Sequence, residues 1–319
     1  MSGSNDHIQD SSRRYGNLTV TEAAGQLRAG QLIAVPTETV YGLAADSSNP
    51  NAVAAIYRTK GRPDFNPLIV HVSDVNAAQI LGQFNNLALK LAETFWPGPL
   101  TLVVPKQQDC DIAPAVTAGL DTIALRCPAH PVMRKLLEES QLNLAAPSAN
   151  RSGGISPTSA QHVLASLGNA APGILDAGPC QRGVESTIVA VRGDGYVILR
   201  PGPLTAEELE KFIGCPPMPD NNGKIEAPGQ LASHYAPLKA LRLNVSDAEP
   251  DEYHIGFGDV HGEVNLSPEA DLAEAASRIF AFLHLADASN SAKIAVAPIP
   301  HSGMGYAIND RLSRAAADR

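Results

Sequence analysis

The feature that most constrains the fold of this chain is a series of short apolar runs bounded by glycine, proline or asparagine. Between residues 18 and 213 these runs are GQLIAVP (30–36), NPLIVHV (66–72), PLTLVVP (99–105), TIALRC (122–127), STIVAV (186–191) and YVILRPG (196–202). Their lengths and boundaries are typical of buried strands. The helical patterns that separate them lie at 21–29, 51–60, 87–95, 130–140 and 158–167. Because strands and helices alternate imperfectly, we expect an α/β domain with a mixed, twisted sheet rather than a doubly wound one.

The rest of the chain predicts a linker and a second, smaller domain. Residues 215–239 are rich in proline, asparagine and glycine and show little periodicity, which is typical of a linker. Residues 240–319 contain three strand-like runs, an amphipathic helix around 272–283 and a closing helix. We therefore predict a first domain at 1–214, the linker, and a small C-terminal α/β (Rossmann-like) domain. No glycine-rich fingerprint follows a strand in this last domain, so a dinucleotide site is not indicated.

Charge and composition exclude several classes of protein. The net charge of −9 argues against a generally basic surface, so any RNA contact should be weak, local and sensitive to salt. The N-terminal segment lacks the apolar core of a secretory signal, and no apolar run reaches the roughly 20 residues that span a bilayer. Four cysteines stand far apart without a CxxC pair, which fits reduced thiols rather than a metal or redox site. We expect a cytoplasmic protein with no membrane association.

Hydroxyl and cationic side chains gather at the ends of the predicted strands, where α/β proteins bind their ligands. Arg58, Lys60 and Arg62 crowd the end of one helix, where they either complement the helix dipole or hold phosphates, and the sequence leaves both readings open. Arg126 ends an apolar strand, so its charge needs an anion or a carboxylate as partner. Any one of these loops reads as ordinary polar surface; a binding site is favoured because four such loops all supply hydroxyls or cations.

Familiar catalytic motifs are absent from the sequence. It contains no GxxxxGK[ST] loop, GxSxG elbow, HExxH or DxDxDG loop, so neither a nucleophile nor a metal site built from protein side chains is predicted. No side chain is an obvious general base. His71 lies inside an apolar strand, where a hydrogen-bonded core histidine is the common outcome. The linker is unusual in ending with SHYAP (233–237), whose aromatic and titratable side chains a passive tether does not need.

Ordered motifs between Leu18 and Ile213 identify a family. They are PTETVYGL (36–43), Lys60-Gly61-Arg62, NPLIVH (66–71), APSAN (146–150) and ESTI (185–188). In this order they strongly resemble the YrdC-like threonylcarbamoyl-AMP synthase family. SHYAP and the C-terminal unit resemble the longer, two-domain branch of that family, so the resemblance covers almost the whole chain.

The resemblance implies a YrdC-like α/β twist with a large, positively lined concave cavity, and a nucleotidyltransferase reaction. Threonine and bicarbonate or CO₂ would form a carbamate that attacks the α-phosphorus of ATP, giving threonylcarbamoyl-AMP and pyrophosphate. Cations would suppress the repulsion between the two anions, and Mg²⁺ would share that task on the phosphates. The product would pass to the machinery that transfers threonylcarbamoyl to tRNA, which forms N6-threonylcarbamoyladenosine.

The resemblance also assigns residues to the two substrates. Threonine would be bound by Thr39, His71, Arg126, Ala146 and Ser186, with Arg126 as the natural partner of its carboxylate. ATP would be bound by Arg58, Lys60, Arg62, Asn66, Thr122, Ser148, Ser156, Arg200 and Tyr235. The catalytic group, acting by charge and positioning, would be Lys60, Arg62, Ser148 and Asn150. Tyr235 would reach the nucleotide because the linker folds back over the cavity as a lid that excludes water.

Two other functions stay open from the sequence. An RNA-binding or ribosome-assembly module could use the same basic cavity; it would bind RNA without threonine and be indifferent to ATP. The acidic charge and the low aromatic content count against it. A carbamoyl-transfer enzyme for another amine would differ only in the pocket around Thr39, Arg126 and Ser186. Oligomeric state, lid motion and the role of residues 240–319 are also left open.

Overall fold

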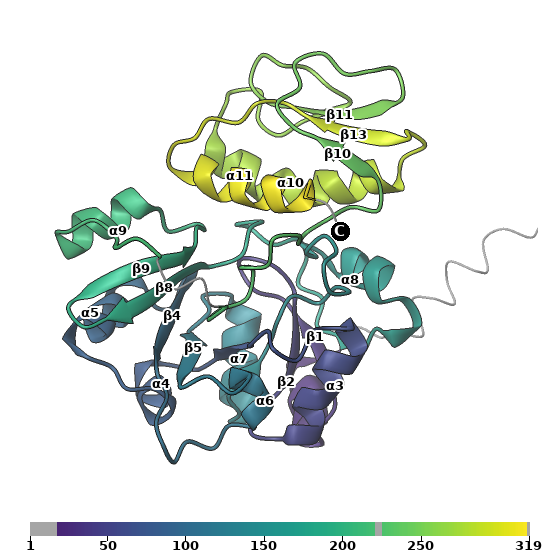
Figure 1. Ribbon diagram of the computed structural model, residues 1–319. Coiled ribbons are helices and arrows are strands. Elements are labelled where there is room, and N and C mark those ends of the chain that lie inside the picture. The colour runs from purple at the N-terminus through teal and green to yellow at the C-terminus, as the bar shows by residue number, and fades with distance from the viewer. Residues whose placement is uncertain (1–17, 221–224, 318–319) are drawn as a thin grey trace, which may run out of the picture.

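The structure, a computed structural model, describes residues 18–220 and 225–317. The N-terminal segment, which we expect to lack a secretory signal, lies outside the described residues. Within the described part the strands form two sheets, one of nine strands and one of four. Figure 1 shows the smaller unit resting on the larger through its two long helices, α10 (Leu272–Ala288) and α11 (Met304–Ala315). No described helix is long and apolar enough to cross a bilayer.

The larger sheet is mixed, as the sequence predicts, with the strand order β7-β1-β2-β6-β3-β5-β4-β8-β9. Its strands are β1 (Ile33–Val35), β2 (Gly42–Asp46), β3 (Ile69–His71), β4 (Leu100–Pro105), β5 (Thr122–Arg126), β6 (Leu144–Ala145), β7 (Gly173–Ile174), β8 (Thr187–Arg192) and β9 (Gly195–Arg200). β3 and β5 run parallel, whereas β4 and β5 run antiparallel. We did not predict β2, because its sequence GLAAD consists mostly of residues with low strand propensity. Hydrogen bonding to β1 and β6 nevertheless holds this segment as a strand.

Helices cover the larger sheet. They are α2 (Val20–Arg28), α3 (Pro50–Lys60), α4 (Val75–Leu81), α5 (Asn86–Phe95), α6 (Pro114–Thr117), α7 (Pro131–Ser140), α8 (Ala160–Leu167) and α9 (Ala206–Ile213), with a 3₁₀ turn at Gly168–Ala170. The five predicted helices are confirmed; α4, α6 and α9 are short and were not expected. The N-cap of α2 is Thr19, which forms a capping box with Glu22, so the helix begins at Val20, one residue before the predicted start.

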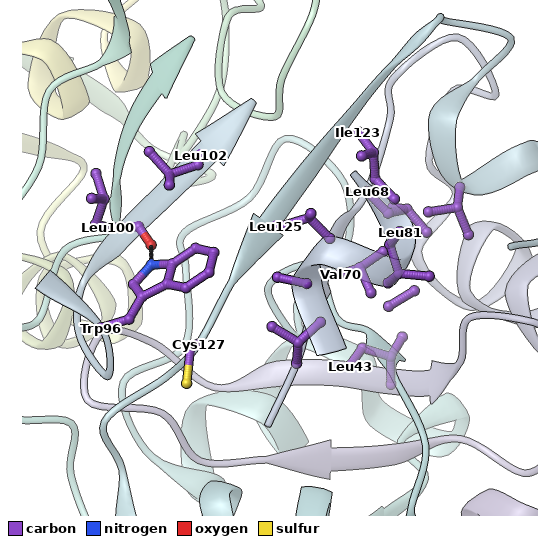
Figure 2. Packing of buried hydrophobic residues seen from close by; sticks show 14 of the residues in the cluster. Leu43, Leu68, Val70, Leu81, Trp96, Leu100, Leu102, Ile123, Leu125 and Cys127 are labelled. Atoms are coloured by element: carbon purple, nitrogen blue, oxygen red, sulfur yellow. Dashed lines mark hydrogen bonds between the residues drawn. The ribbon is translucent and has the colours of Figure 1, made fainter. Parts of the chain in front are cut away.

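The main core lies between the sheet and these helices. Figure 2 shows Leu43, Val70 and Leu125 packed in it, together with the indole of Trp96. The indole Nε1 donates to the carbonyl of Leu100 at 2.7 Å, which satisfies the one polar atom that a buried tryptophan carries. This core fixes the strands whose ends form the site described below.

The smaller unit is an all-parallel sheet covered by helices, in agreement with the predicted Rossmann-like class. Its strand order is β10-β13-β11-β12. The strands are β10 (Ala240–Arg242), β11 (Glu252–Gly256), β12 (Val264–Asn265) and β13 (Lys293–Val296), all paired in parallel. α10 connects β12 to β13, and its buried face carries Ile279 and Leu283 toward the core that the two units share.

The two units share one apolar core. Val40, Ile155 and Val184, from loops of the larger unit, belong to the same buried cluster as α10 and α11. The contact is close: a Cβ on Gly183 would lie 2.3 Å from the carbonyl oxygen of Ala276, and Gly183 has a φ of +71°. Only glycine fits there, so the loop before ESTI is shaped to meet the second unit.

The described part of the linker runs between the two units and bonds to both. On the smaller unit, the backbone N–H of His234 donates to the carbonyl of Arg314 at 3.1 Å, and the Lys239 ammonium donates to the carbonyl of Ala286 at 2.8 Å. On the larger unit, the N–H of Ala236 donates to the carbonyl of Gly153 at 2.8 Å. The SHYAP segment is thus held in place from both sides.

Candidate active site

A cavity of about 50 Å³ lies where the loops at several strand ends meet the linker. Its lining includes Thr39, His71, Arg126, Ala146 and Ser186, the whole set that the resemblance assigned to threonine. It also includes Arg62, Ser148, Arg200 and Tyr235 from the set assigned to ATP. The sequence therefore identified side chains that the fold brings together from loops far apart along the chain.

Sheet register explains why these side chains converge. β3 and β5 are parallel neighbours, and their register places His71 directly beside Arg126 at the strand ends. On the other side of β3, Ala146 follows β6, and its backbone N–H donates to the carbonyl of Ile69 at 3.1 Å. A bridge between Gly42 and Ser148 brings in the start of β2. Neighbouring strand ends thus form one edge of the site.

Arg126 finds its partner within the chain. Its guanidinium donates to Glu38 Oε1 at 2.7 Å, to the Thr39 hydroxyl at 2.9 Å and to the carbonyl of Gly98 at 3.3 Å. Arg126 and Glu38 are both buried. Burial by itself would raise the pKa of Glu38, but Arg126 lowers it below its ordinary value, so the pair is ionic. We predicted that Arg126 needs a carboxylate or an anion, yet did not single out Glu38, although it stands beside Thr39 in PTETVYGL.

Three further buried cations surround the rest of the cavity. Lys60 donates to the carbonyls of Ser148 and Asn150, each at 2.5 Å, and so holds the APSAN loop. Arg62 donates to Asn66 Oδ1 at 2.7 Å, and Arg200 donates to the Ser186 hydroxyl at 3.1 Å. Gly61, with a φ of +61°, ends α3 and lets the chain turn between the two cations of the K-x-R motif.

Burial leaves these cations short of negative charge. It lowers the pKa of Lys60 well below its ordinary value, and the neighbouring charge of Arg62 adds to that effect. It also lowers the pKa of Arg62 to about 10 and lowers that of Arg200. Such a group of buried cations favours an anionic ligand, because an added negative charge offsets both the free-energy cost of burying the cations and their mutual repulsion.

Some assigned residues lie outside the cavity lining. Arg58 is exposed on α3, since two residues along a helix turn a side chain through about 200° from the buried Lys60. Thr122 is half-buried at the opposite end of β5 from Arg126. The others stand one layer back, behind residues that line it: Lys60, Asn66, Asn150 and Ser156.

Comparison with known proteins shows the family to which this chain belongs. The Sua5/YciO/YrdC family model, described as "Telomere recombination", matches residues 25–202, and the model of the threonylcarbamoyl-AMP synthase C-terminal domain matches residues 204–317. The chain belongs to the threonylcarbamoyl-AMP synthase family. The threonylcarbamoyl-AMP synthase of Bacillus subtilis is 38% identical over 94% of this chain and 93% of that protein. The Pyrococcus abyssi enzyme of the same name is 38% identical over 93% of this chain and 94% of that protein.

A solved structure of the threonylcarbamoyl-AMP synthase family agrees with the fold. The crystal structure of Pyrococcus abyssi Sua5 complexed with L-threonine matches with a TM-score of 0.85 at 35% identity, covering 93% of this chain and 94% of that one. The predicted family, its two-domain branch and the YrdC-like fold are therefore confirmed. The large concave cavity stays a prediction, since the linker covers the site in this structure.

The linker fills much of the space above the loops that carry the family motifs. Pro228, Gly229, His234 and Tyr235 line the cavity, and about 50 Å³ has room for one or two water molecules but not for a nucleotide. Tyr235 is buried and has a φ of +63°, a strained conformation for a residue with a side chain. The linker therefore lies over the side chains assigned to the two substrates.

Several buried polar atoms at the site have no hydrogen-bond partner among the described residues. They include Nδ1 of His71, Nδ1 of His234, Oδ1 of Asn150, Nδ2 of Asn66 and the hydroxyl of Tyr235. Buried polar atoms are almost always paired in folded proteins. Unpaired atoms grouped beside one cavity are the positions at which a polar substrate can supply the missing partner.

The buried histidines make the stability of this protein depend on pH. Burial lowers the pKa of His71 and of His234 to about 3 from an ordinary value of 6.5. Between these values the unfolded chain binds more protons than the folded chain, so stability is lost as the pH falls through this window. Each histidine contributes about 1.4 kcal/mol per pH unit.

We expect the melting temperature to fall clearly between pH 6.5 and pH 5, and the fall to be shallower in His234→Gln. The control His261→Gln, at an exposed position, should keep the full slope; an equal slope in all three proteins would contradict this prediction.

Proposed function

We propose that this chain is an L-threonylcarbamoyladenylate synthase, which condenses L-threonine, bicarbonate or CO₂, and ATP to threonylcarbamoyl-AMP and pyrophosphate. The observation that carries the proposal is that one small cavity collects every residue assigned to threonine, Arg126 among them, together with two further buried arginines, Arg62 and Arg200. Further support comes from the names of the two relatives and from the L-threonine complex of Pyrococcus abyssi Sua5.

On the threonine side, we propose that Arg126 binds the carboxylate. Three of its five N–H groups have acceptors in the chain, so two remain for a substrate oxygen. His71 stays neutral because burial lowers its pKa to about 3, and it offers Nδ1 without adding positive charge. The surrounding cations disfavour an ammonium group, which frees the lone pair of the threonine amine.

The reaction then needs charge compensation more than acid–base chemistry. The amine nitrogen bonds to the carbon of CO₂ and loses a proton, which gives the carbamate. A carbamate oxygen attacks the α-phosphorus, the bond to the bridging oxygen of the β-phosphate breaks, and pyrophosphate leaves. Carbamate and triphosphate repel each other, and Lys60, Arg62 and Arg200 would offset that repulsion in a buried site where such an effect is large.

We propose that Mg²⁺ arrives with the triphosphate. Among the described residues no group of three or more His, Cys, Asp or Glu side chains could hold a metal ion. The two carboxylates beside the cavity, Glu38 and Glu185, are each paired with an arginine. Because both carboxylates are engaged in ion pairs, we propose that phosphate oxygens would supply most of the ligands of the ion, which when bound would offset their charge.

Mass spectrometry of the products tests the proposal. The protein is mixed with ATP, magnesium, bicarbonate and threonine, with threonine omitted as the control. We expect threonylcarbamoyl-AMP and a matching amount of pyrophosphate only when threonine is present. RNA retained by a protein that makes no adenylate would favour the RNA-binding module, and adenylate formed only with another amine would favour a related carbamoyl-transfer enzyme.

We further propose that the product passes, in the cytoplasm, to the enzymes that modify tRNA.

We also propose that the linker at 215–239 acts as a lid that protects the mixed anhydride from water. Gly229 offers a test because it has a φ of +89°, and a Cβ there would lie 2.8 Å from the Tyr235 hydroxyl and 2.9 Å from Cδ of Arg200. We expect Gly229→Ala to displace the lid, so that adenylate is hydrolysed or released several-fold faster. The measurement is the ratio of AMP to threonylcarbamoyl-AMP over time.

Gly119→Ala is the matched control for the lid variant. Gly119 has a φ of +79°, but a Cβ there would meet nothing within 4 Å, so it carries the backbone strain without the clash. The lid assignment is contradicted if the two variants accumulate adenylate equally well. Truncation after Ile213 should also impair formation or retention of the adenylate, although it exposes the apolar loops that face the second unit.

A further inference from the structure

One arginine of the smaller unit reaches into the loops of the larger one. Arg311, on α11, is fully buried. Its Nε donates to Oε2 of Glu185 at 2.9 Å, and its Nη2 donates to the carbonyl of Glu185 at 3.4 Å. The guanidinium carbon also lies 5.4 Å from the centre of the Tyr235 ring. The contact therefore joins the second unit to the ESTI motif and to the linker at one point.

Glu185 connects this arginine to the site. Its side chain lines the cavity, and its second oxygen, Oε1, accepts a hydrogen bond from the Ser156 hydroxyl. Burial by itself would raise the pKa of Glu185, but Arg311, Arg200 and the Ser156 hydroxyl lower it below its ordinary value. An ionised carboxylate held by an arginine on one side is a strong, directed acceptor for a hydroxyl on the other.

The second unit contacts Ser156 by another route as well. Nε2 of His284, on α10, donates to the carbonyl of Ser156 at 3.1 Å. The ring of His284 stacks on that of His162, on α8, at a centroid distance of 4.0 Å. The backbone and the hydroxyl of Ser156 are thus both fixed by chains of contacts that begin in the second unit.

The simpler explanation is an interdomain ion pair that only stabilises the fold, but it accounts for fewer of the contacts that Glu185 makes. Removing two charges from water largely cancels the attraction of a buried ion pair, so such pairs add little net stability. The interface already contains an apolar cluster formed by both units. Stability alone does not explain why the second carboxylate oxygen of Glu185 accepts a hydrogen bond from Ser156, a residue assigned to ATP binding.

We propose that Arg311 is a positioning residue: acting through Glu185, it holds the Ser156 hydroxyl where the nucleotide binds, so that the second domain completes the ATP side of the site. This inference rests on the proposed function for the identity of the nucleotide, and it gives residues 240–319 a part in the reaction. The Arg311 guanidinium itself touches neither ATP nor threonine.

Steady-state kinetics of the full chain test the inference. In Arg311→Met we expect the KM for ATP to rise about tenfold or more, with a change of less than about threefold in the KM for threonine. Arg311→Lys, which restores the positive charge but not the several donors of the planar guanidinium, should recover part of the loss. Arg278→Met is the matched control, because the Arg278 side chain, on α10, pairs with Glu274 and donates to the carbonyl of Leu266, and neither residue lines the cavity. It should leave both constants unchanged.

A double-variant cycle shows whether Arg311 acts through Glu185. If it does, Arg311→Met combined with Glu185→Gln raises the KM for ATP no further than the worse single variant. The double variant leaves neither member of the Arg311–Glu185 pair as a lone buried charge, so it serves as the folded comparison if Arg311→Met is unstable. Additive effects, or an unchanged KM for ATP in folded Arg311→Met, would overturn the inference.

Direct titration with ATP separates this inference from the proposed function. If wild-type protein makes no threonylcarbamoyl-AMP but Arg311→Met still binds ATP at least tenfold more weakly, the proposed function fails and the positioning role stands. If wild-type protein makes the adenylate and Arg311→Met binds ATP with unchanged affinity, the function stands and the positioning role fails.

Discussion

Replacing Arg126 with alanine should reduce kcat/KM for threonine by about 10²- to 10³-fold, while the affinity for ATP changes little. The reason is that truncating one member of a buried, hydrogen-bonded charge pair typically costs 2–5 kcal/mol. In the proposed complex the threonine carboxylate loses its cation, and Thr39 loses the donor at 2.9 Å that orients its hydroxyl. Initial rates at varied threonine, with ATP saturating, measure the effect.

The same substitution affects folding, which must be separated from binding. Without Arg126, the buried Glu38 carboxylate keeps the backbone N–H of Ala129, at 3.1 Å, as a hydrogen-bond donor but loses its cation. We expect Arg126→Ala to lose about 3–5 kcal/mol of stability, as is usual when one partner of a buried pair is removed. Adding Glu38→Gln should restore most of the melting temperature and none of the threonine use. A normal KM and kcat for threonine in the folded double variant would show that the carboxylate assignment is wrong.

The threonine side of the site was predictable because it depends on strands. A buried strand must end at a loop, and where neighbouring strands are parallel the motifs that follow them meet at one edge of the sheet. The division of these residues between threonine and ATP came from the family resemblance. The parallel register of β3 and β5 places His71 beside Arg126, as this argument requires. The mixed character of the sheet was also predictable, because helices did not alternate strictly with strands.

The ATP side was less predictable, because the place of one assigned residue depends on which face of a helix it occupies. Arg58 was grouped with Lys60 and Arg62 by proximity in sequence, whereas helical periodicity separates neighbours by face and leaves Arg58 exposed. Helical spacing could have given this result, because Lys60 and Arg58 differ by two positions. Glu38 could likewise have been found by asking which carboxylate neutralises Arg126.

No local pattern could have found the contact between Glu185 and Arg311. The two residues are 126 positions apart and belong to different units, and they meet because α11 packs against the loop before β8. Arg311 appears in the sequence only as a cation on an amphipathic helix, a place where most arginines are exposed. Complete burial of its side chain is what distinguishes it, and burial across an interface is a property of the folded chain alone.

The second large effect is expected from Lys60, whose ammonium combines two tasks. It holds the APSAN loop through the carbonyls of Ser148 and Asn150, and it adds positive charge beside Arg62. In Lys60→Met both tasks are lost, and we expect kcat/KM for ATP to fall by at least about 100-fold, the usual effect of removing one preorganised donor from such a site. The control is Lys135→Met, an exposed lysine paired with Glu139 on α7, which should behave as wild type.

Lys60→Gln separates the two tasks of that lysine. Its amide can still donate to one of the two carbonyls but carries no charge, so the loop should stay ordered while ATP use is lost. The fold should tolerate the change, because burial already penalises the ammonium and its removal relieves repulsion from Arg62. We expect the melting temperature of Lys60→Gln to stay within a few degrees of wild type. ATP titration and single-turnover adenylate formation measure the loss. If Lys60→Gln keeps its affinity for ATP and its rate, the lysine only supports the loop, and the charge that opposes phosphate repulsion must come from Arg62 and Arg200.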